Sequence, residues 1–93
     1  MNKADLVSVV AAGTGLTQVE VAAVVEGVLE GISDALIRDD HVEIRGFGTF
    51  KVEQRAARDA INPQTGQRIR VEAKKAPVFR PSDKLKARVN GKA

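Results

Sequence analysis

The sequence has no cysteine, no tryptophan and no tyrosine, and its only aromatic residues are three phenylalanines among 93 residues. The absence of cysteine excludes disulfide bonds and thiolate metal sites, and the single histidine, His41, cannot form a metal site alone. No apolar run approaches the ~18 residues that a membrane span requires, and the first residues do not resemble a signal peptide. We therefore expect one soluble, intracellular domain over residues 1–93, with no metal, no cofactor and no membrane partner.

Patterns typical of catalysis are also absent. The chain offers no nucleophile paired with a base, and it has no glycine-rich loop of the kind that cradles phosphates. We therefore predict that the protein is not an enzyme, has no catalytic residues and takes no small-molecule substrate.

Charges of opposite sign are separated along the chain. Residues 1–40 carry two basic and seven acidic groups, whereas residues 41–93 carry thirteen basic and five acidic groups. The formal net charge of +3 therefore hides an acidic half and a strongly basic half. Such an asymmetry favours a scaffold joined to a surface that binds nucleic acid or another polyanion.

Two helices are predicted in the acidic half. Asn2 and Asp5 have the spacing of a reciprocal helix cap, and the helix that follows should end near residues 13–15. Thr17 and Glu20 form a second capping box, after which apolar residues recur at helical spacing to about residue 38.

The second helix is apolar over an unusually wide arc, which a single shallow contact would not cover. A domain of this size without disulfides or metals is also marginal as a monomer. We therefore expect an obligate dimer in which the helical parts, residues 1–40, interlock.

Strand patterns fill residues 41–80. Val42-Glu43-Ile44-Arg45 alternates as a half-buried strand does, Gly46-Phe47-Gly48 permits a tight turn, and a third strand returns near Phe79. Phe47 and Phe50 should point to the core, and all three phenylalanines should cluster at the base of a hairpin. Pro81-Ser82-Asp83 should cap a helix over residues 82–90. The predicted fold is α+β: a two-helix half, a three-stranded antiparallel sheet extended into a protruding hairpin, and a short last helix.

The protruding hairpin, called the arm here, covers residues 53–76. Its centre, Asn62-Pro63-Gln64-Thr65-Gly66, is a turn sequence, because proline fixes φ and glycine accepts a positive φ. The arm has few large apolar residues and should not bury a face of its own, so we expect its cations to bind a polyanion. The basic candidates are Arg55, Arg58, Arg68, Arg70, Lys74 and Lys75.

Four motifs together resemble the bacterial histone-like HU/IHF family. They are Gly46-Phe47-Gly48-Thr49-Phe50, Arg55-Ala56-Ala57-Arg58, Asn62-Pro63-Gln64-Thr65-Gly66, and Phe79-Arg80-Pro81 ahead of Lys84-Leu85-Lys86. The resemblance spans the whole chain and implies an intertwined homodimer whose two arms reach around double-stranded DNA through the minor groove. It also implies that Pro63 is the wedge that enters between base steps and kinks the duplex. We add Ile61, Asn62 and Gln64 at the tip, and Arg80, Lys84 and Lys86 beyond the arm, to the candidate DNA-binding residues.

Family arms often read Gly-Arg where this chain has Ala60-Ile61, and Asp59 adds an acid to the arm. Both changes should weaken phosphate contact, while Ile61 should enlarge the apolar wedge or pack at the tip. The expected function is a nucleoid-associated, cytoplasmic protein that bends and compacts DNA with little sequence specificity. Two alternatives remain: an IHF-like subunit with a preferred site and possibly a paralogous partner, or an oligomerising module whose basic ribbon binds an acidic protein.

Overall fold

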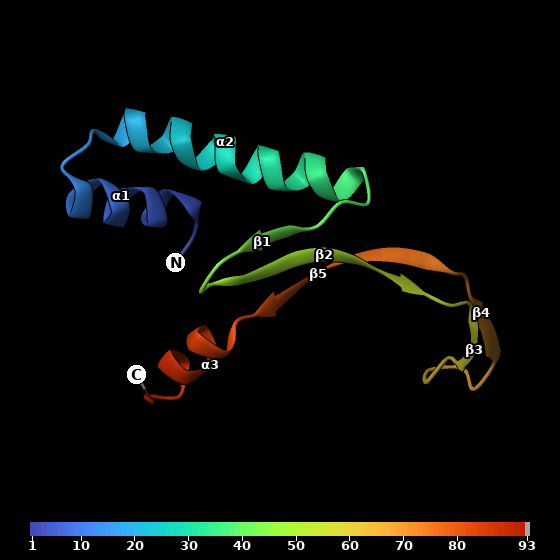
Figure 1. Cartoon of the computed structure of the whole chain (residues 1–93). Helices are drawn as coiled ribbons and strands as arrows, with labels where there is room; N and C mark the ends of the chain where they lie inside the picture. The colour runs from blue at the N-terminus through green and yellow to red at the C-terminus, as the bar shows by residue number, and fades with distance from the viewer. Residues whose placement is uncertain (93) are drawn as a thin grey trace. The chain divides into compact units, whose positions relative to one another are not determined.

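The computed structural model describes residues 1–92, which fall into two compact units. The first unit is Met1–Ala35 and the second begins at Leu36. Figure 1 gives the labels of the helices and strands. The sequence interpretation of residues 1–93 as a single domain remains a prediction.

The first helix, α1 (Lys3–Thr14), begins at the predicted reciprocal cap. The backbone N–H of Asp5 donates to the Asn2 side chain at 2.9 Å, and the Asn2 N–H donates to the Asp5 carboxylate at 2.9 Å. The helix ends at Gly15, whose φ of 77° is left-handed and therefore favours glycine. Both ends match the sequence prediction because both are set by local chemistry.

The second helix, α2 (Gln18–Ile37), begins at the predicted capping box. The Glu20 N–H donates to the Thr17 hydroxyl at 3.1 Å, and the Thr17 N–H donates to the Glu20 carboxylate at 3.0 Å. These bonds from the Thr17 backbone and side chain hold the pKa of the Glu20 carboxyl below its ordinary value, because they favour its charged form.

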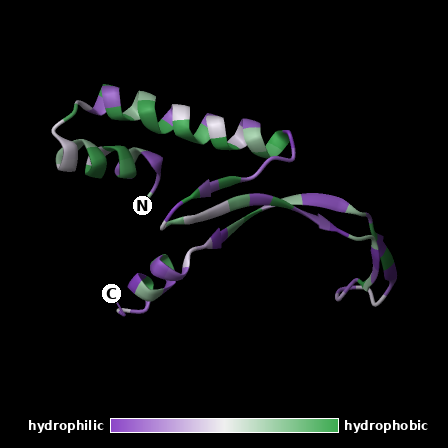
Figure 2. Ribbon diagram, in the orientation of Figure 1, coloured by the Kyte–Doolittle hydropathy of each residue, from purple (hydrophilic) through white to green (hydrophobic). Residues whose placement is uncertain are grey.

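The core of the first unit is small. Val7, Ala11 and Val21 are buried against one another where α1 and α2 meet, and Lys3 of α1 forms an ion pair with Glu26 of α2. Figure 2 shows hydrophobic residues spread along both helices, including positions outside this contact. The large apolar side chains of these helices that stay exposed are Leu6, Val9, Val19, Val24, Val28, Leu29 and Ile37. The wide apolar arc predicted for the second helix is therefore present and largely uncovered in the single chain.

Among residues 1–92, no single helix is both long enough and apolar enough to cross a membrane. Taken together, α1 and α2 would meet that requirement of length and composition, but the chain bends by 119° at the break between them.

The second unit contains a three-stranded antiparallel sheet, as predicted. Its strands are β1 (Val42–Ile44), β2 (Gly48–Arg55) and β5 (Lys74–Pro81), in the order β1-β2-β5. Since side chains alternate between the faces of a strand, the register fixes which residues share a face. One face carries Val42, Ile44, Phe50, Val52, Pro77 and Phe79, and the other carries Lys51, Glu53, Arg55, Lys74 and Arg80.

The three phenylalanines form the predicted cluster. The ring centroid of Phe79 lies 4.8 Å from that of Phe50 and 5.2 Å from that of Phe47, and all ring pairs are tilted. Phe47 and Phe79 nevertheless stay 43% and 37% exposed. The cluster is therefore a partly open surface in the single chain, whereas the sequence led us to expect Phe47 inside a core.

The last helix, α3 (Asp83–Val89), is fixed to the turn between β1 and β2. The Ser82 hydroxyl accepts from the Leu85 N–H at 3.0 Å, which caps the helix as predicted. The Ser82 N–H donates to the Phe47 carbonyl at 2.9 Å, so the start of the helix is tied to the phenylalanine turn.

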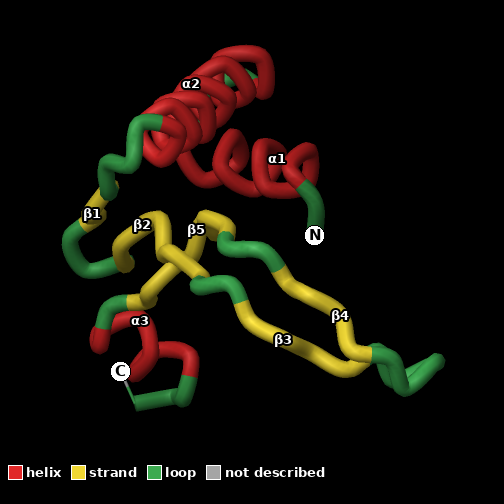
Figure 3. Tube along the Cα trace, turned by 90° about the vertical axis from the view of Figure 1, so that its right-hand side faces the viewer, coloured by secondary structure: helices red, strands yellow, loops and turns green. Residues whose placement is uncertain are grey.

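Beyond the sheet, the chain forms a second antiparallel pair, β3 (Arg58–Ile61) and β4 (Arg68–Val71). Residues 56–57 and 72–73 lie outside both sheets and interrupt the ladder, as Figure 3 shows by the loop colour between the yellow segments. The predicted arm over residues 53–76 thus consists of a sheet extension and a separate hairpin, with a break that the alternating sequence did not reveal.

Candidate nucleic-acid interface

The register of the β3–β4 hairpin determines which arm residues share a face, a question that the sequence left open. Arg58 pairs with Val71, and Ala60 pairs with Ile69, so one face is mainly apolar. Asp59, Ile61, Arg68 and Arg70 occupy the opposite face. The arm therefore presents one mostly apolar side and one mostly charged side, although neither side is buried.

The tip of the arm is a turn closed by Asn62. The Asn62 side-chain oxygen accepts from the Gln64 N–H at 2.9 Å, and the Asn62 carbonyl accepts from the Gly66 N–H at 2.7 Å. Gly66 has a φ of 73°, which explains the glycine at this position. The predicted turn is therefore confirmed, and capping is the observed use of the Asn62 side chain.

Pro63 is exposed at the outermost turn of the hairpin, next to the exposed Gln64. Ile61 precedes this turn and is 66% exposed, so it does not pack at the tip as one interpretation of the sequence suggested. The position and exposure of Pro63 and Ile61 suit an apolar wedge, while their contact with DNA stays a prediction.

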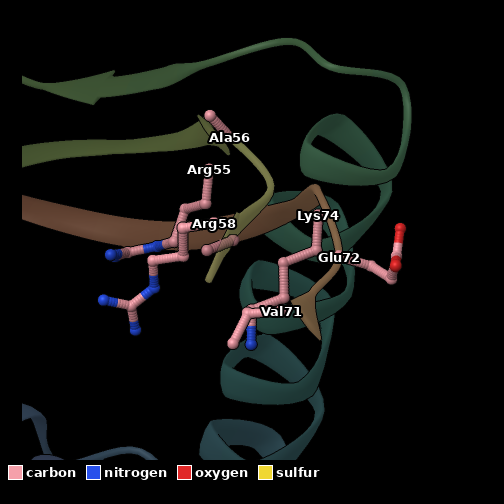
Figure 4. Close-up of a pocket in the computed structure, with 7 residues that line it drawn as sticks. Arg55, Ala56, Arg58, Val71, Glu72 and Lys74 are labelled. Carbon is pink, nitrogen blue, oxygen red and sulfur yellow. The ribbon is translucent and has the colours of Figure 1, made fainter. Parts of the chain in front are cut away.

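A concave cationic surface lies where the sheet ends and the hairpin begins. Arg55, Arg58 and Lys74, called the bend cluster here, line a hollow of about 660 Å³. In Figure 4 the Arg55 and Arg58 side chains extend toward the same side, whereas the Glu72 carboxylate points away from them. The remaining lining residues are Ala56, Val71, Glu72 and Ala76.

Three other predicted DNA-binding cations are paired with carboxylates. The Lys75 ammonium group lies 2.6 Å from the Asp39 carboxylate, and the Arg80 guanidinium lies 2.6 Å from the Glu53 carboxylate. The third pair is Arg70 with Asp59, at 3.6 Å across the hairpin. The sequence indicates the cations but not Asp39 and Glu53 as their partners, because these pairs join residues 36 and 27 positions apart.

The Arg80 pair also affects the chemistry of Glu53. The hydrogen bond from Arg80 is the main cause that holds the pKa of the Glu53 carboxyl below its ordinary value. The Glu53 side chain is 30% exposed, whereas Arg80 is largely open to solvent. This pair lies on the sheet face that also carries Arg55 and Lys74.

The remaining candidates lie outside the arm. Lys84 and Lys86 are exposed on α3, and the Lys84 side chain passes near Gly46 of the phenylalanine turn. Lys51 was not among the predicted residues, although it shares the sheet face of Arg55. The alternating pattern of β2 would have indicated that Lys51 shares a face with Arg55, because residues an even number of positions apart on a strand lie on the same face.

No group of three or more metal-ligating side chains occurs among residues 1–92.

Comparisons with known proteins agree with the HU/IHF resemblance. The chain is 48% identical to the SPbeta prophage-derived DNA-binding protein HU 2 of Bacillus subtilis (strain 168), over 99% of this chain and all of that protein. It is 42% identical to the integration host factor subunit alpha of Myxococcus xanthus (strain DK1622), over the whole of this chain and 72% of that one. The cocrystal structure of Anabaena HU with DNA superposes with a TM-score of 0.88 at 34% identity, covering 96% of this chain and 97% of that one. Because the family model described as bacterial DNA-binding protein matches residues 1–90, this chain belongs to that family, together with HU proteins and integration host factor subunits.

Proposed function

We propose that this chain acts as an HU-like architectural protein, which binds double-stranded DNA as a homodimer, bends it and compacts the nucleoid of the bacterial cytoplasm. The observation that carries the proposal is the arm: a hairpin without a buried face, bordered by cations and ending in the exposed Pro63. An element that buries nothing of its own is explained by a partner, and its cations fit the phosphates of a duplex.

The homodimer follows from how little the single chain buries. Among residues 1–92, the buried apolar side chains are Val7, Ala11, Val21 and Ala35. On α2, Val24 and Val28 are 61% and 52% exposed, so a second copy that covers them would remove a large apolar surface from water. Dimerisation would also place two arms on one duplex.

The arms supply both binding and bending in this proposal. Bending a duplex by 40–90° costs of order 1–6 kcal/mol, and each unstacked base step costs roughly a few more. Pro63 of each arm would concentrate the bend at two steps, with Ile61 beside it. Cations along the arms and on α3 would contact the phosphates brought close by the bend and so offset the cost.

Sequence preference should be weak, because the minor groove distinguishes base pairs poorly. The Asn62 side-chain oxygen, which could otherwise accept a hydrogen bond from a base edge, already accepts from the Gln64 N–H. An IHF-like subunit with a preferred site is the second candidate, favoured by the 42% identity to an integration host factor subunit. Nothing in this proposal requires enzymatic activity or a cofactor.

Binding to a random-sequence duplex, measured over a range of salt concentrations, tests the proposal. We expect log K to fall linearly with the logarithm of the salt concentration, with a slope of about −0.9 for each phosphate neutralised. We also expect energy transfer between dyes on the duplex ends to increase as the DNA bends. A flat salt dependence, or binding that leaves the duplex straight, would overturn the proposal. A much tighter complex with one A-tract-flanked site than with random DNA would favour the IHF-like alternative.

A further inference from the structure

The predicted DNA-binding cations of the arm and its base fall into two groups. Arg70, Lys75 and Arg80 are each paired with a carboxylate of the same chain. The bend cluster differs, because none of Arg55, Arg58 and Lys74 is within ion-pair distance of a carboxylate among residues 1–92. Arg68 on β4 is unpaired in the same sense, but it does not line the hollow with the other three. The sequence gives all seven residues the same appearance, so this division comes from the fold.

A cation that already has a carboxylate partner gains less from a phosphate. At 2.6 Å, an oxygen of Asp39 and an oxygen of Glu53 each occupy one hydrogen-bond donor of Lys75 and Arg80, and their charge already offsets that of the cation. A contact with DNA would exchange one anion for another and would leave a carboxylate facing the phosphate backbone. The like charges of carboxylate and phosphate then repel, which cancels much of the new attraction.

The bend cluster has the opposite electrostatics. Arg55 and Arg58 extend toward the same side in Figure 4, and both line the same hollow as Lys74. Like charges held close together repel, and an anion between them removes that repulsion. Because guanidinium groups bind phosphate oxygens in a bidentate geometry, a backbone phosphate suits this hollow better than it suits the paired cations.

We propose that the bend cluster is the principal phosphate-binding site of each arm, and that Asp39, Glu53 and Asp59 limit DNA affinity by competing with phosphates for Lys75, Arg80 and Arg70. The inference rests on the proposed function and refines it, because it separates the cations that bind DNA from those that mainly stabilise the protein. It predicts a smaller salt dependence than the number of arm cations suggests.

Salt dependence measured on matched arginine variants tests the first half of the inference. We expect Arg58→Gln to weaken binding and to reduce the slope of log K against log salt by about 0.9 for each arm. Arg70→Gln removes the same charge from the same hairpin, and we expect it to change the slope by less than about half as much. Lys74→Gln repeats the bend-cluster test should Arg58→Gln disturb folding, which thermal unfolding would reveal.

Carboxylate variants test the second half. We expect Asp59→Asn to steepen the salt slope and tighten binding several-fold, because it releases Arg70 for phosphates. Glu30→Gln on α2 makes the same change in net charge without releasing a paired cation, and we expect a much smaller effect. The outcomes separate the two hypotheses. Equal effects of Arg58→Gln and Arg70→Gln, or of Asp59→Asn and Glu30→Gln, would overturn this inference alone, whereas a wild-type protein that fails to bind DNA would overturn the proposed function as well.

Discussion

The ring of Phe79 lies so close to Gly48 that a Cβ atom on this glycine would be 2.6 Å from two of the ring carbons. The same Cβ would lie 2.6 Å from the backbone carbonyl oxygen of Arg80, on the strand paired with Gly48. The predicted strand-to-strand turn therefore needs its second glycine for close approach, whereas Gly46 needs a left-handed φ of 80°.

Replacing Gly48 should destabilise the second unit. In Gly48→Ala, both the phenylalanine ring and the β5 backbone would have to shift, and overpacking of this kind costs roughly 1–3 kcal/mol. Urea unfolding followed by circular dichroism would measure the loss. Gly13→Ala in α1 is the matched control, because a Cβ there meets no atom within 4 Å. We expect Gly13→Ala to leave stability unchanged or to raise it by up to about 1 kcal/mol, and equal losses in the two variants would contradict the steric argument.

Pro63→Ala should separate bending from binding. The substitution leaves the charges of the arm intact, so we expect affinity for a short duplex to fall less than about threefold, on the order of 0.6 kcal/mol. Bending should fall markedly because the rigid wedge is lost. Energy transfer across the duplex and ring closure of short DNA would report the bend. Gln67→Ala, at an exposed position on the other side of the same turn, should bend DNA as the wild type does. Unchanged bending in Pro63→Ala would exclude the wedge.

Val28→Asp should disrupt the proposed dimer. This valine is 52% exposed on α2, and full burial of such a side chain is worth about 1.5–3 kcal/mol, which an introduced carboxylate would forfeit. We expect the dissociation constant of the dimer to rise at least about tenfold, as measured by sedimentation at micromolar concentration. Glu30→Gln, two positions along the same helix, should remain dimeric. A wild-type chain that sediments as a stable monomer would refute the dimer itself.

The parts of the fold that follow from local chemistry could be predicted from the sequence. The caps at Asn2, Thr17 and Ser82, the turn at Asn62 and the three-stranded sheet all appear where their residue patterns placed them. Each depends on hydrogen bonds or alternation over a few residues, which a short stretch of sequence specifies.

The division among the cations could not be predicted in the same way. It depends on the β3–β4 register, where a shift of one residue would exchange the faces of the hairpin and move Asp59 away from Arg70. It also depends on pairs such as Asp39 with Lys75, which are distant in the sequence and are brought together by the fold. For this reason the sequence left open which arm cations have a carboxylate partner, and the structure shows paired and unpaired cations.

Glu53 should make stability depend on pH in the acidic range. Because Arg80 holds the pKa of the folded-state carboxyl below its ordinary value of 4.5, the ion pair stabilises the folded protein fully above that pH. As the pH falls below 4.5 and through the lowered pKa, Glu53 takes up a proton and this contribution is lost. Glu53→Gln should therefore lower the melting temperature at pH 7 and show a smaller decrease than the wild type as the pH is lowered from neutral through the acidic range. Glu43→Gln on β1, an exposed acid without an ion pair among residues 1–92, should keep the wild-type profile. Parallel pH profiles for the wild type and Glu53→Gln would show that the pair with Arg80 does not stabilise the fold in solution.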